Sequence, residues 1–409
     1  MDYQVYFAQS LEDLRKAGHY RTFANIERIA GAFPHARHYR HDTIEEWGEV
    51  TVWCSNDYLG MGQHPVVIAA MVEALRACGV GAGGTRNISG TTYHHVLLER
   101  ELAAWCGKEA ALLFTSGYVA NMTTLSTLGY KIPGLVLFSD DANHNSMIEG
   151  VRHSRATKEI FYHNDPDHLD KLMARYPKNQ PKLVLFESIY SMDGAIAPIA
   201  ALCEVAERHG AMTFLDEVHA VGMYGESGAG VAERDGQLDR ITFYQATLAK
   251  AIGVIGGFIA GSAQAVDFVR SFGNGFIFTT ALPPAVAAGA LASVRYLQLH
   301  PELRALHQER AATCKRRLRE AGIPVMETSA SHIVPVMVGD SVRCKQASDD
   351  LLERHRIYVQ PINYPTVPIG AERLRLTPTP LHDDKAMEQL VVALTDIWHR
   401  LGLHYQKIV

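Results

Sequence analysis

Short apolar runs of strand length alternate with longer, helix-like stretches along most of this chain. The apolar runs lie at 110–114, 135–138, 182–186, 211–215, 241–244 and 257–260. Such alternation is typical of α/β proteins, in which helices connect the strands of a mostly parallel sheet. The sequence therefore predicts an α/β fold. Stretches with a helical pattern include 66–77, 283–298, 301–320 and 383–401.

The chain is long enough for more than one domain. Of its 409 residues, 47% are hydrophobic, which is sufficient for a large core. The rhythm of the sequence changes near residue 297, and charged helices dominate after it. We expect an N-terminal arm over 1–60, a large domain over 61–297 and a small C-terminal domain over 298–409.

Charge and cysteine usage restrict the partners and the compartment. A formal net charge of −5 argues against a surface that binds nucleic acid. The six cysteines are scattered without a Cys-x-x-Cys pair, which predicts neither a zinc site nor a disulfide framework and suits a reducing compartment. The sequence shows no signal-peptide pattern and no membrane span of roughly 20 apolar residues. We expect a cytoplasmic protein without a metal, a nucleic-acid partner or a membrane partner.

Lys250 and Asp216 carry the most chemical information. Asp216 falls where the run 211–215 ends, and ligands of open parallel sheets bind outside the carboxyl ends of the strands. A pyridoxal cofactor needs a lysine for its aldehyde and a carboxylate for its ring nitrogen, and His219 is near enough in sequence to reach the phenolic oxygen. The alternative is that Asp216 caps a turn, that His219 is a core histidine and that Lys250 is a solvated lysine. The combination favours an enzyme that uses pyridoxal 5'-phosphate (PLP).

Two further segments follow strand-like runs. Ser116, Gly117 and Tyr118 open a helix after 110–114, and a helix N-terminus offers free N–H groups to a phosphate, although Ser-Gly is also a common N-cap. His144 lies in a polar cluster after 135–138. It is a candidate to stack on a pyridine ring and donate a proton, and a turn explains the same cluster without any function.

The segment 81–90, Gly-Ala-Gly-Gly-Thr-Arg-Asn-Ile-Ser-Gly, is too rich in glycine for the interior of a helix or strand. We expect its backbone to approach another group closely, with a plain surface loop as the alternative. Gly79, Gly81 and Gly84 also match the glycine spacing of dinucleotide-binding oxidoreductases. They follow the helical stretch 66–77 instead of a strand, so the context of that motif is missing.

In their order and spacing these motifs resemble the α-oxoamine synthases over nearly the whole chain. The matching parts are 20–23, 56–62, 81–90, 216–222, Lys250 and the region from Thr279 to Arg375. The resemblance implies the type I fold of PLP-dependent transferases, similar to aspartate aminotransferase. That fold has a mostly parallel seven-stranded sheet and a smaller α+β C-terminal domain. The resemblance also implies a homodimer whose active sites are shared between the subunits.

The resemblance assigns roles to individual residues. Lys250 corresponds to the lysine that holds PLP, Asp216 to the partner of the ring nitrogen, His144 to the stacking histidine and His219 to the partner of the phenolic oxygen. The other cofactor positions are Ser116, Gly117, Tyr118, Ser188 and Thr247, with Thr279 and Thr280 from the other chain. The substrate positions are Arg375 and Asn56 for the glycine carboxylate, Arg21, Thr85 and Asn87 for the succinyl carboxylate, Lys158 for the CoA phosphates, and Ser139 and Thr366.

The implied reaction joins glycine to succinyl-CoA and releases CoA and carbon dioxide, at the entry to tetrapyrrole synthesis. Sister enzymes such as 2-amino-3-ketobutyrate CoA ligase and 8-amino-7-oxononanoate synthase are the main alternative, and a non-enzymatic paralogue is another. Arg21, Thr85 and Asn87 favour succinyl-CoA over the other acyl groups. The sequence departs from the family pattern at Ala246, usually glycine, and Ile252, usually aromatic. Ile369 stands where a loop that closes over the site usually has a basic residue.

Overall fold

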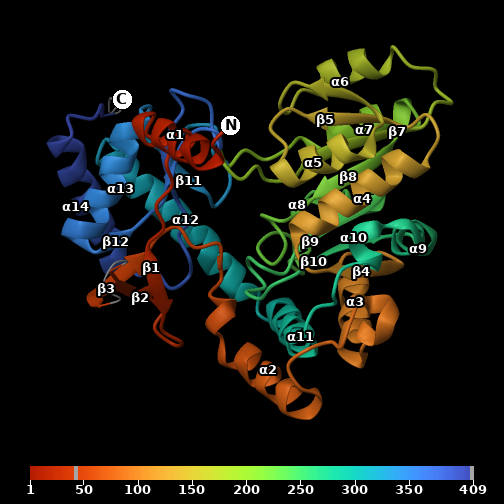
Figure 1. Ribbon diagram of the computed structural model, residues 1–409, viewed down its shortest axis with the longest axis horizontal. Coiled ribbons are helices and arrows are strands. Elements are labelled where there is room, and N and C mark those ends of the chain that lie inside the picture. Colours follow the sequence, from red (N-terminus) through yellow and green to blue (C-terminus); the bar gives the residue numbers. More distant parts are fainter. Residues whose placement is uncertain (41–44, 406–409) are drawn as a thin grey trace. The chain divides into compact units, whose positions relative to one another are not determined.

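The computed structural model describes residues 1–40 and 45–405 and divides into two compact units (Figure 1). We call residues Asn56–Ser191 and Ala195–Ala305 the sheet unit. The terminal unit comprises Met1–Ser55, Met192–Gly194 and Leu306–Val409. The N-terminal residues therefore share a unit with the C-terminal ones. The division into domains at residues 60 and 297 stays a prediction.

The sheet unit is built on a seven-stranded sheet with the order β4-β10-β9-β8-β7-β5-β6. Strand β10 pairs antiparallel with β4 and β9, and the other neighbours are parallel. The predicted α/β fold with a mostly parallel sheet is confirmed. The strands are β4 (Ala110–Phe114), β5 (Val136–Asp140), β6 (Thr157–Phe161), β7 (Lys182–Glu187), β8 (Met212–Asp216), β9 (Phe243–Thr247) and β10 (Gly257–Gly261).

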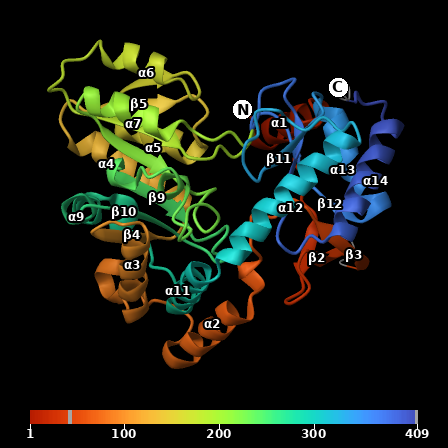
Figure 2. The same ribbon diagram turned by 180° about the vertical axis from the view of Figure 1, so that it is seen from behind.

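Helices surround this sheet, as Figures 1 and 2 show. Apolar side chains of α4, β5, β7 and β8 form one core cluster that includes Leu125, Leu137, Leu185 and Phe214. The helices are α2 (Pro65–Cys78), α3 (Tyr93–Trp105), α4 (Gly117–Lys131), α5 (Asn145–Ser154), α6 (Pro166–Met173), α7 (Ile199–Arg208), α8 (Val231–Arg234), α9 (Ala263–Phe272), α10 (Asn274–Ile277) and α11 (Pro284–Leu299). Short turns of other helix types are η1 (Met61–Gln63), η2 (Arg86–Gly90) and η3 (Leu238–Arg240).

One strand of this sheet escaped the sequence analysis. All residues of β7 are buried, which explains its continuous apolar run, because a central parallel strand is covered on both faces. Strand β6 lies at the edge of the sheet and leaves three of its five residues exposed. Its sequence, Thr-Lys-Glu-Ile-Phe, therefore lacks the apolar run that reveals the other strands of this sheet.

The terminal unit contains two smaller sheets, with the orders β1-β2-β3-β12 and β11-β14-β13. Its core includes Trp53, Leu374, Leu394 and Trp398. The strands are β1 (Asn25–Arg28), β2 (His35–Tyr39), β3 (Glu46–Val52), β11 (Val334–Met337), β12 (Ile357–Tyr358), β13 (Pro361–Ile362) and β14 (Arg373–Leu376). The helices are α1 (Tyr3–Lys16), α13 (Ser341–His355) and α14 (Asp384–Arg400), and α12 (Pro301–Glu320) contains the boundary between the units.

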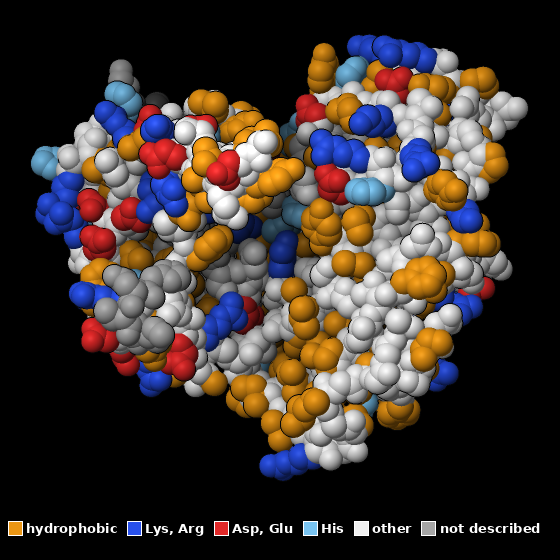
Figure 3. Space-filling model, viewed as in Figure 1, with side chains coloured by type: hydrophobic (Ala, Val, Ile, Leu, Met, Phe, Trp, Pro, Cys, Tyr) orange, Lys and Arg blue, Asp and Glu red, His pale blue; other side chains and the backbone are white. Residues whose placement is uncertain are grey.

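Helix α1 has no buried residue. Its exposed apolar side chains are Tyr3, Val5, Tyr6, Phe7, Leu11 and Leu14, and Figure 3 shows hydrophobic side chains gathered in this region of the surface. All six cysteines are free, as the scattered pattern predicts. Among the helices of the described residues, none is long and apolar enough to cross a membrane.

Candidate active site

Asp216 is the last residue of β8, where the sequence predicts it, and its side chain is buried. Its two carboxylate oxygens accept hydrogen bonds from Asn121 Nδ2 at 2.7 Å and from the backbone N of Val218 at 2.8 Å. Burial raises the pKa of Asp216, and these two hydrogen bonds and the charge of Lys250 oppose that rise. A cationic N–H group at the carboxylate would stabilise the ionised form further, so this position suits a protonated ring nitrogen.

His144 caps the N-terminus of α5, and its Nδ1 accepts a hydrogen bond from the backbone N of Ser146 at 3.2 Å. Burial lowers the pKa of His144, while the charge of Asp216 raises it and that of Lys250 lowers it. These influences place His144, Asp216 and Lys250 in one neighbourhood. The neutral ring, with Nδ1 as acceptor, carries its proton on Nε2.

Lys250 belongs to a chain of hydrogen bonds within the sheet unit. Its Nζ lies 2.7 Å from His219 Nε2, and His219 Nδ1 lies 2.7 Å from the hydroxyl of Tyr58. Tyr58 donates to Asn56 Oδ1 at 3.1 Å, so its oxygen accepts from His219 Nδ1. A neutral His219 therefore presents Nε2 to Lys250 as an acceptor. The structure brings Lys250 and His219 together, as the sequence analysis expects.

The candidate phosphate cradle lies at the start of α4. Ser116 is the N-cap and accepts from the backbone N of Val119 at 3.1 Å, while the first N–H groups of a helix have no intrahelical acceptor. A Cβ on Gly117 would lie 3.2 Å from Thr247 Cβ, and a Cβ on Gly257 would lie 2.4 Å from Gly117 N. Gly117 and Thr247 are therefore adjacent, and the backbone of β10 packs directly on the first turn of α4.

Of four other predicted residues, three make hydrogen bonds within the protein and one is exposed. Ser188 is fully buried and donates to Glu217, and Ser139 Oγ accepts from Asn143 Nδ2 at 2.9 Å. Tyr118 is half-exposed and donates to Asn145 Oδ1 at 3.2 Å. Lys158 is exposed on the edge strand β6. The structure gives Ser188 and Ser139 hydrogen-bond partners of their own, so their assignment to ligands rests on the resemblance alone.

Thr85 and Thr280 form a second group, since they pair in an isolated antiparallel bridge. The backbone N of Ala281 donates to Gly84 O at 3.0 Å. The glycine-rich segment therefore does meet another backbone closely, as its composition predicts. Asn87 is exposed on the same segment, and Thr279 directly precedes Thr280.

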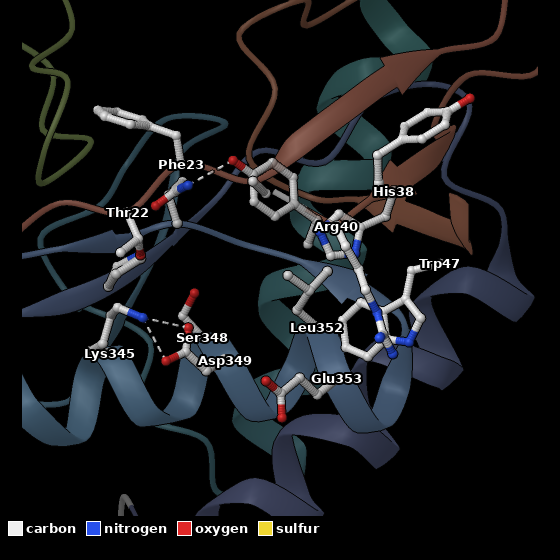
Figure 4. A pocket seen from close by; sticks show the side chains of 15 residues that line it. Thr22, Phe23, His38, Arg40, Trp47, Lys345, Ser348, Asp349, Leu352 and Glu353 are labelled. Carbon is white, nitrogen blue, oxygen red and sulfur yellow. Dashed lines mark hydrogen bonds and ion pairs between the residues drawn. The ribbon is translucent and has the colours of Figure 1, made fainter. Parts of the chain in front are cut away.

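Arg21, Thr366 and Arg375 belong to the terminal unit. Arg21 Nη2 donates to Thr366 Oγ1 at 3.3 Å, and both residues are exposed. Arg375 lies on β14 and is 6% exposed. In the same unit, a pocket of about 230 Å³ is lined by residues that include Thr22, Trp47 and Lys345 (Figure 4).

The three residues that depart from the family pattern differ in burial. Ala246 and Ile252 are fully buried, and Ala246 pairs with Phe258 of β10. Ile369 is 75% exposed, so this apolar side chain lies on the surface.

Sequence reasoning missed the buried residues that support Asp216 and His144. Asn121 also donates to Ser146 Oγ at 3.0 Å, and Glu187 accepts from the backbone N of His144 at 2.5 Å. Burial and the adjacent Asp216 carboxylate raise the pKa of Glu187 well above its ordinary value. A polar side chain one turn into an apolar helix was the available signal for Asn121. Glu187 directly follows the predicted strand 182–186, the same position that revealed Asp216.

These residues fit PLP. The buried Asp216 suits a protonated ring nitrogen, the start of α4 suits a phosphate, and Lys250 is the amine that an aldehyde requires. Gly117 lies so close to Thr247 and Gln245 that a side chain at position 117 would crowd the cradle. All these residues belong to the sheet unit.

Known proteins agree with the fold. Residues 48–394 match the family model described as aminotransferase class I and II. The 5-aminolevulinate synthase of Rhizobium meliloti is 57% identical over 98% of this chain and 99% of its own length. The 5-aminolevulinate synthase 1 of Cereibacter sphaeroides is 55% identical over 100% of both chains.

Solved structures show the same architecture. A serine palmitoyltransferase with PLP has a TM-score of 0.89 and 31% identity over 97% of both chains. The 8-amino-7-oxononanoate synthase of Francisella tularensis has a TM-score of 0.71 at 22% identity, over 86% of this chain and 98% of its own, which shows the fold alone.

The fold and the matched region thus define a protein of the aminotransferase class I and II group, with the type I fold that the sequence analysis expects. Within this group, the identities above 50% over the whole chain decide the family. The chain belongs to the 5-aminolevulinate synthase family.

Proposed function

We propose that this protein uses PLP to condense glycine with succinyl-CoA, giving 5-aminolevulinate, CoA and carbon dioxide. Two facts support this function. Its close relatives are 5-aminolevulinate synthases, and a serine palmitoyltransferase of the same fold has been solved with PLP. The observation that carries the proposal is the neighbourhood of Asp216, His144 and Lys250. Asp216 is a buried carboxylate held by Asn121 and Val218, and the charge of Lys250 opposes the rise of its pKa on burial.

The residues of the sheet unit have complementary tasks. When bound, PLP supplies an electron sink for negative charge that develops on the α-carbon of glycine. Asp216 keeps a proton on the ring nitrogen, and Asn121 and Val218 hold its carboxylate in place. Lys250 Nζ takes the proton from the α-carbon. With PLP bound, His219 would hydrogen-bond the phenolic oxygen of the cofactor, and Tyr58 orients the ring of His219.

The substrate carboxylates call for cationic partners. We assign the glycine carboxylate to Arg375 with help from Asn56, because a guanidinium forks onto a carboxylate in two parallel hydrogen bonds. We assign the terminal carboxylate of succinyl-CoA to Arg21, Thr85 and Asn87. The hydrogen bond from Arg21 to Thr366 brings another predicted substrate residue to this arginine. The homodimer with shared active sites and the cytoplasmic location stay predictions.

A titration tests the proposed function. The purified protein should absorb as a PLP enzyme, and its spectrum should change as glycine is added. Turnover is then compared with succinyl-, acetyl- and pimeloyl-CoA. We expect succinyl-CoA to give the highest kcat/KM, and a preference for either of the other thioesters would assign the chain a different acyl donor.

Replacement of Arg21 by leucine should change the choice of acyl donor. The wild type should prefer succinyl-CoA to butyryl-CoA by about 10²-fold or more, since butyryl-CoA leaves a charged group of the pocket unpaired. Arg21→Leu removes that charge and should lower kcat/KM for succinyl-CoA while the value for butyryl-CoA holds or rises. The measurement is kcat/KM for both thioesters at saturating glycine.

Arg37→Leu is the matched control. Arg37 also lies in the N-terminal part of the terminal unit, and it pairs with Glu27 at 3.2 Å on the surface. The control should leave the ratio of the two kcat/KM values unchanged. An unchanged ratio in Arg21→Leu as well would show that the carboxylate pocket lies elsewhere.

A further inference from the structure

Arg86 stands between Thr85 and Asn87, the two residues of the sheet unit that we assign to the succinyl carboxylate. An arginine at this place in the sequence suggests a direct ligand for that carboxylate. The structure gives its guanidinium a different direction. Arg86 Nη1 and Nη2 donate to the two oxygens of Glu99 on α3, at 2.7 and 3.0 Å.

This ion pair is largely shielded from solvent, and the nitrogens of Arg86 have hydrogen-bond acceptors within the protein. The side chains of Arg86 and Glu99 are 9% and 16% exposed. Arg86 Nε donates to Thr91 Oγ1 at 3.1 Å, and its guanidinium lies 5.5 Å from the ring of Phe276. Every nitrogen of the guanidinium thus has an acceptor inside the protein. Glu99 neutralises the charge, which leaves little attraction for a substrate anion.

Glu99 also ties the pair to the sheet. Its Oε1 accepts from the backbone N of Leu113 in β4 at 3.0 Å. Arg86 therefore connects the glycine-rich segment to α3 and, through Glu99, to β4 at one edge of the seven-stranded sheet. On its other side, the segment is held by Thr280 and Ala281.

The segment itself is a tightly closed loop. The backbone N–H groups of Ile88 and Gly90 both donate to Thr85 O at 2.9 Å. A Cβ on Gly84 would lie 2.3 Å from Ile88 O, and a Cβ on Gly90 would lie 2.3 Å from Gly84 O. Such a loop moves as one piece, so the residue that anchors it sets the position of Thr85 and Asn87 together.

We propose that Arg86 is a positioning residue for recognition of the acyl carboxylate: its buried pair with Glu99 fixes the loop that presents Thr85 and Asn87. This inference rests on the proposed function. It assigns the positive charge of the carboxylate pocket to Arg21 and gives Arg86 no contact with the substrate.

Glu99→Gln separates positioning from direct binding. As a direct ligand, Arg86 would gain an unneutralised charge in this variant, and the KM for succinyl-CoA would fall. As a positioning residue, it loses its bidentate partner, and the KM should rise. A loop displaced by about 1 Å can cost up to about 10²-fold, so we expect an increase of at least about tenfold. Arg86→Lys keeps the charge but loses the fork, and it should raise the KM similarly.

Several readouts must stay constant if the role is positioning. The kcat with succinyl-CoA, the KM for glycine and the kcat/KM for butyryl-CoA should all remain within about threefold of wild type, because none involves the acyl carboxylate. Glu101→Gln is the matched control. Glu101 lies on the same helix and pairs with the half-exposed Arg295 at 2.8 Å. This control should leave the KM for succinyl-CoA unchanged.

The outcomes distinguish the inference from the proposed function. A wild type without preference for succinyl-CoA over butyryl-CoA would refute the proposed function. If the wild type shows that preference, an unchanged or lower KM for succinyl-CoA in Glu99→Gln overturns the positioning role. Melting curves and the PLP spectrum report on folding, and loss of the fold in both Glu99→Gln and Arg86→Lys would also overturn it, because the pair would then serve stability alone.

Discussion

Replacement of Lys250 by alanine should abolish turnover while the protein still folds. Lys250 is the amine proposed to hold PLP and to move the α-proton of glycine, and His219 lies 2.7 Å from its Nζ. General acid–base catalysis by one positioned group contributes about 10²–10⁴-fold, and this variant loses the attachment of the cofactor as well. We therefore expect a loss of at least about 10⁴-fold in kcat.

Reduction with borohydride followed by peptide mass analysis identifies the modified lysine directly. In the wild type, the mass of reduced PLP should appear on the peptide that contains Lys250, and it should be missing from Lys250→Ala. Lys171→Ala, a change at an exposed lysine in the last turn of α6, is the control and should behave as the wild type. The assignment fails if the label appears on another lysine of the wild type.

Replacement of Asp216 by asparagine should have the second largest effect. The change keeps the shape of the side chain and removes the negative charge that holds the proton on the ring nitrogen. It also places an amide N–H group opposite a donor, because both carboxylate oxygens accept hydrogen bonds, from Asn121 and from Val218. We expect kcat to fall by about 10³-fold, or ~4 kcal/mol, and the affinity for PLP to fall less.

Two measurements check this expectation. Fluorescence or absorbance titration gives the affinity for PLP, and steady-state kinetics gives kcat. Asp235→Asn is a suitable control, since Asp235 pairs with Arg234 in a partly exposed ion pair. Turnover near that of the wild type in Asp216→Asn would show that the ring nitrogen needs no charged partner here.

The sequence alone revealed elements with a regular apolar or charged pattern, and polar residues that directly follow a strand. Strand β4 has the bounds that its apolar run predicts, and Asp216 ends β8 as expected. Helix α12 also has its predicted bounds, because its charged pattern runs between Pro301 and Glu320 without interruption. These features depend on neighbours in the chain, so a single sequence displays them.

Contacts between distant positions were beyond that reasoning. Asn121 and Asp216 are 95 positions apart, and Glu187 and His144 are 43 apart. Both pairs form only when the sheet brings the helices that carry Asn121 and follow His144 next to the ends of β8 and β7. Arg86 is the clearest example, since its place between Thr85 and Asn87 suggests a ligand, whereas its guanidinium is directed at Glu99. Composition indicates that a charge is present, and only the fold shows which way it faces.

The close approach of Gly257 to Gly117 has a consequence for how this chain can evolve. Strand β10 contributes no proposed catalytic side chain, yet one methyl group at position 257 would lie 2.4 Å from the backbone N of Gly117. The displaced helix also carries Asn121, which holds Asp216. A change at position 257 would thus disturb both the phosphate end and the ring-nitrogen end of the site. A position without a reactive side chain can therefore be among the least replaceable in a lineage. A survey of tolerated substitutions should find position 257 as intolerant of change as Lys250.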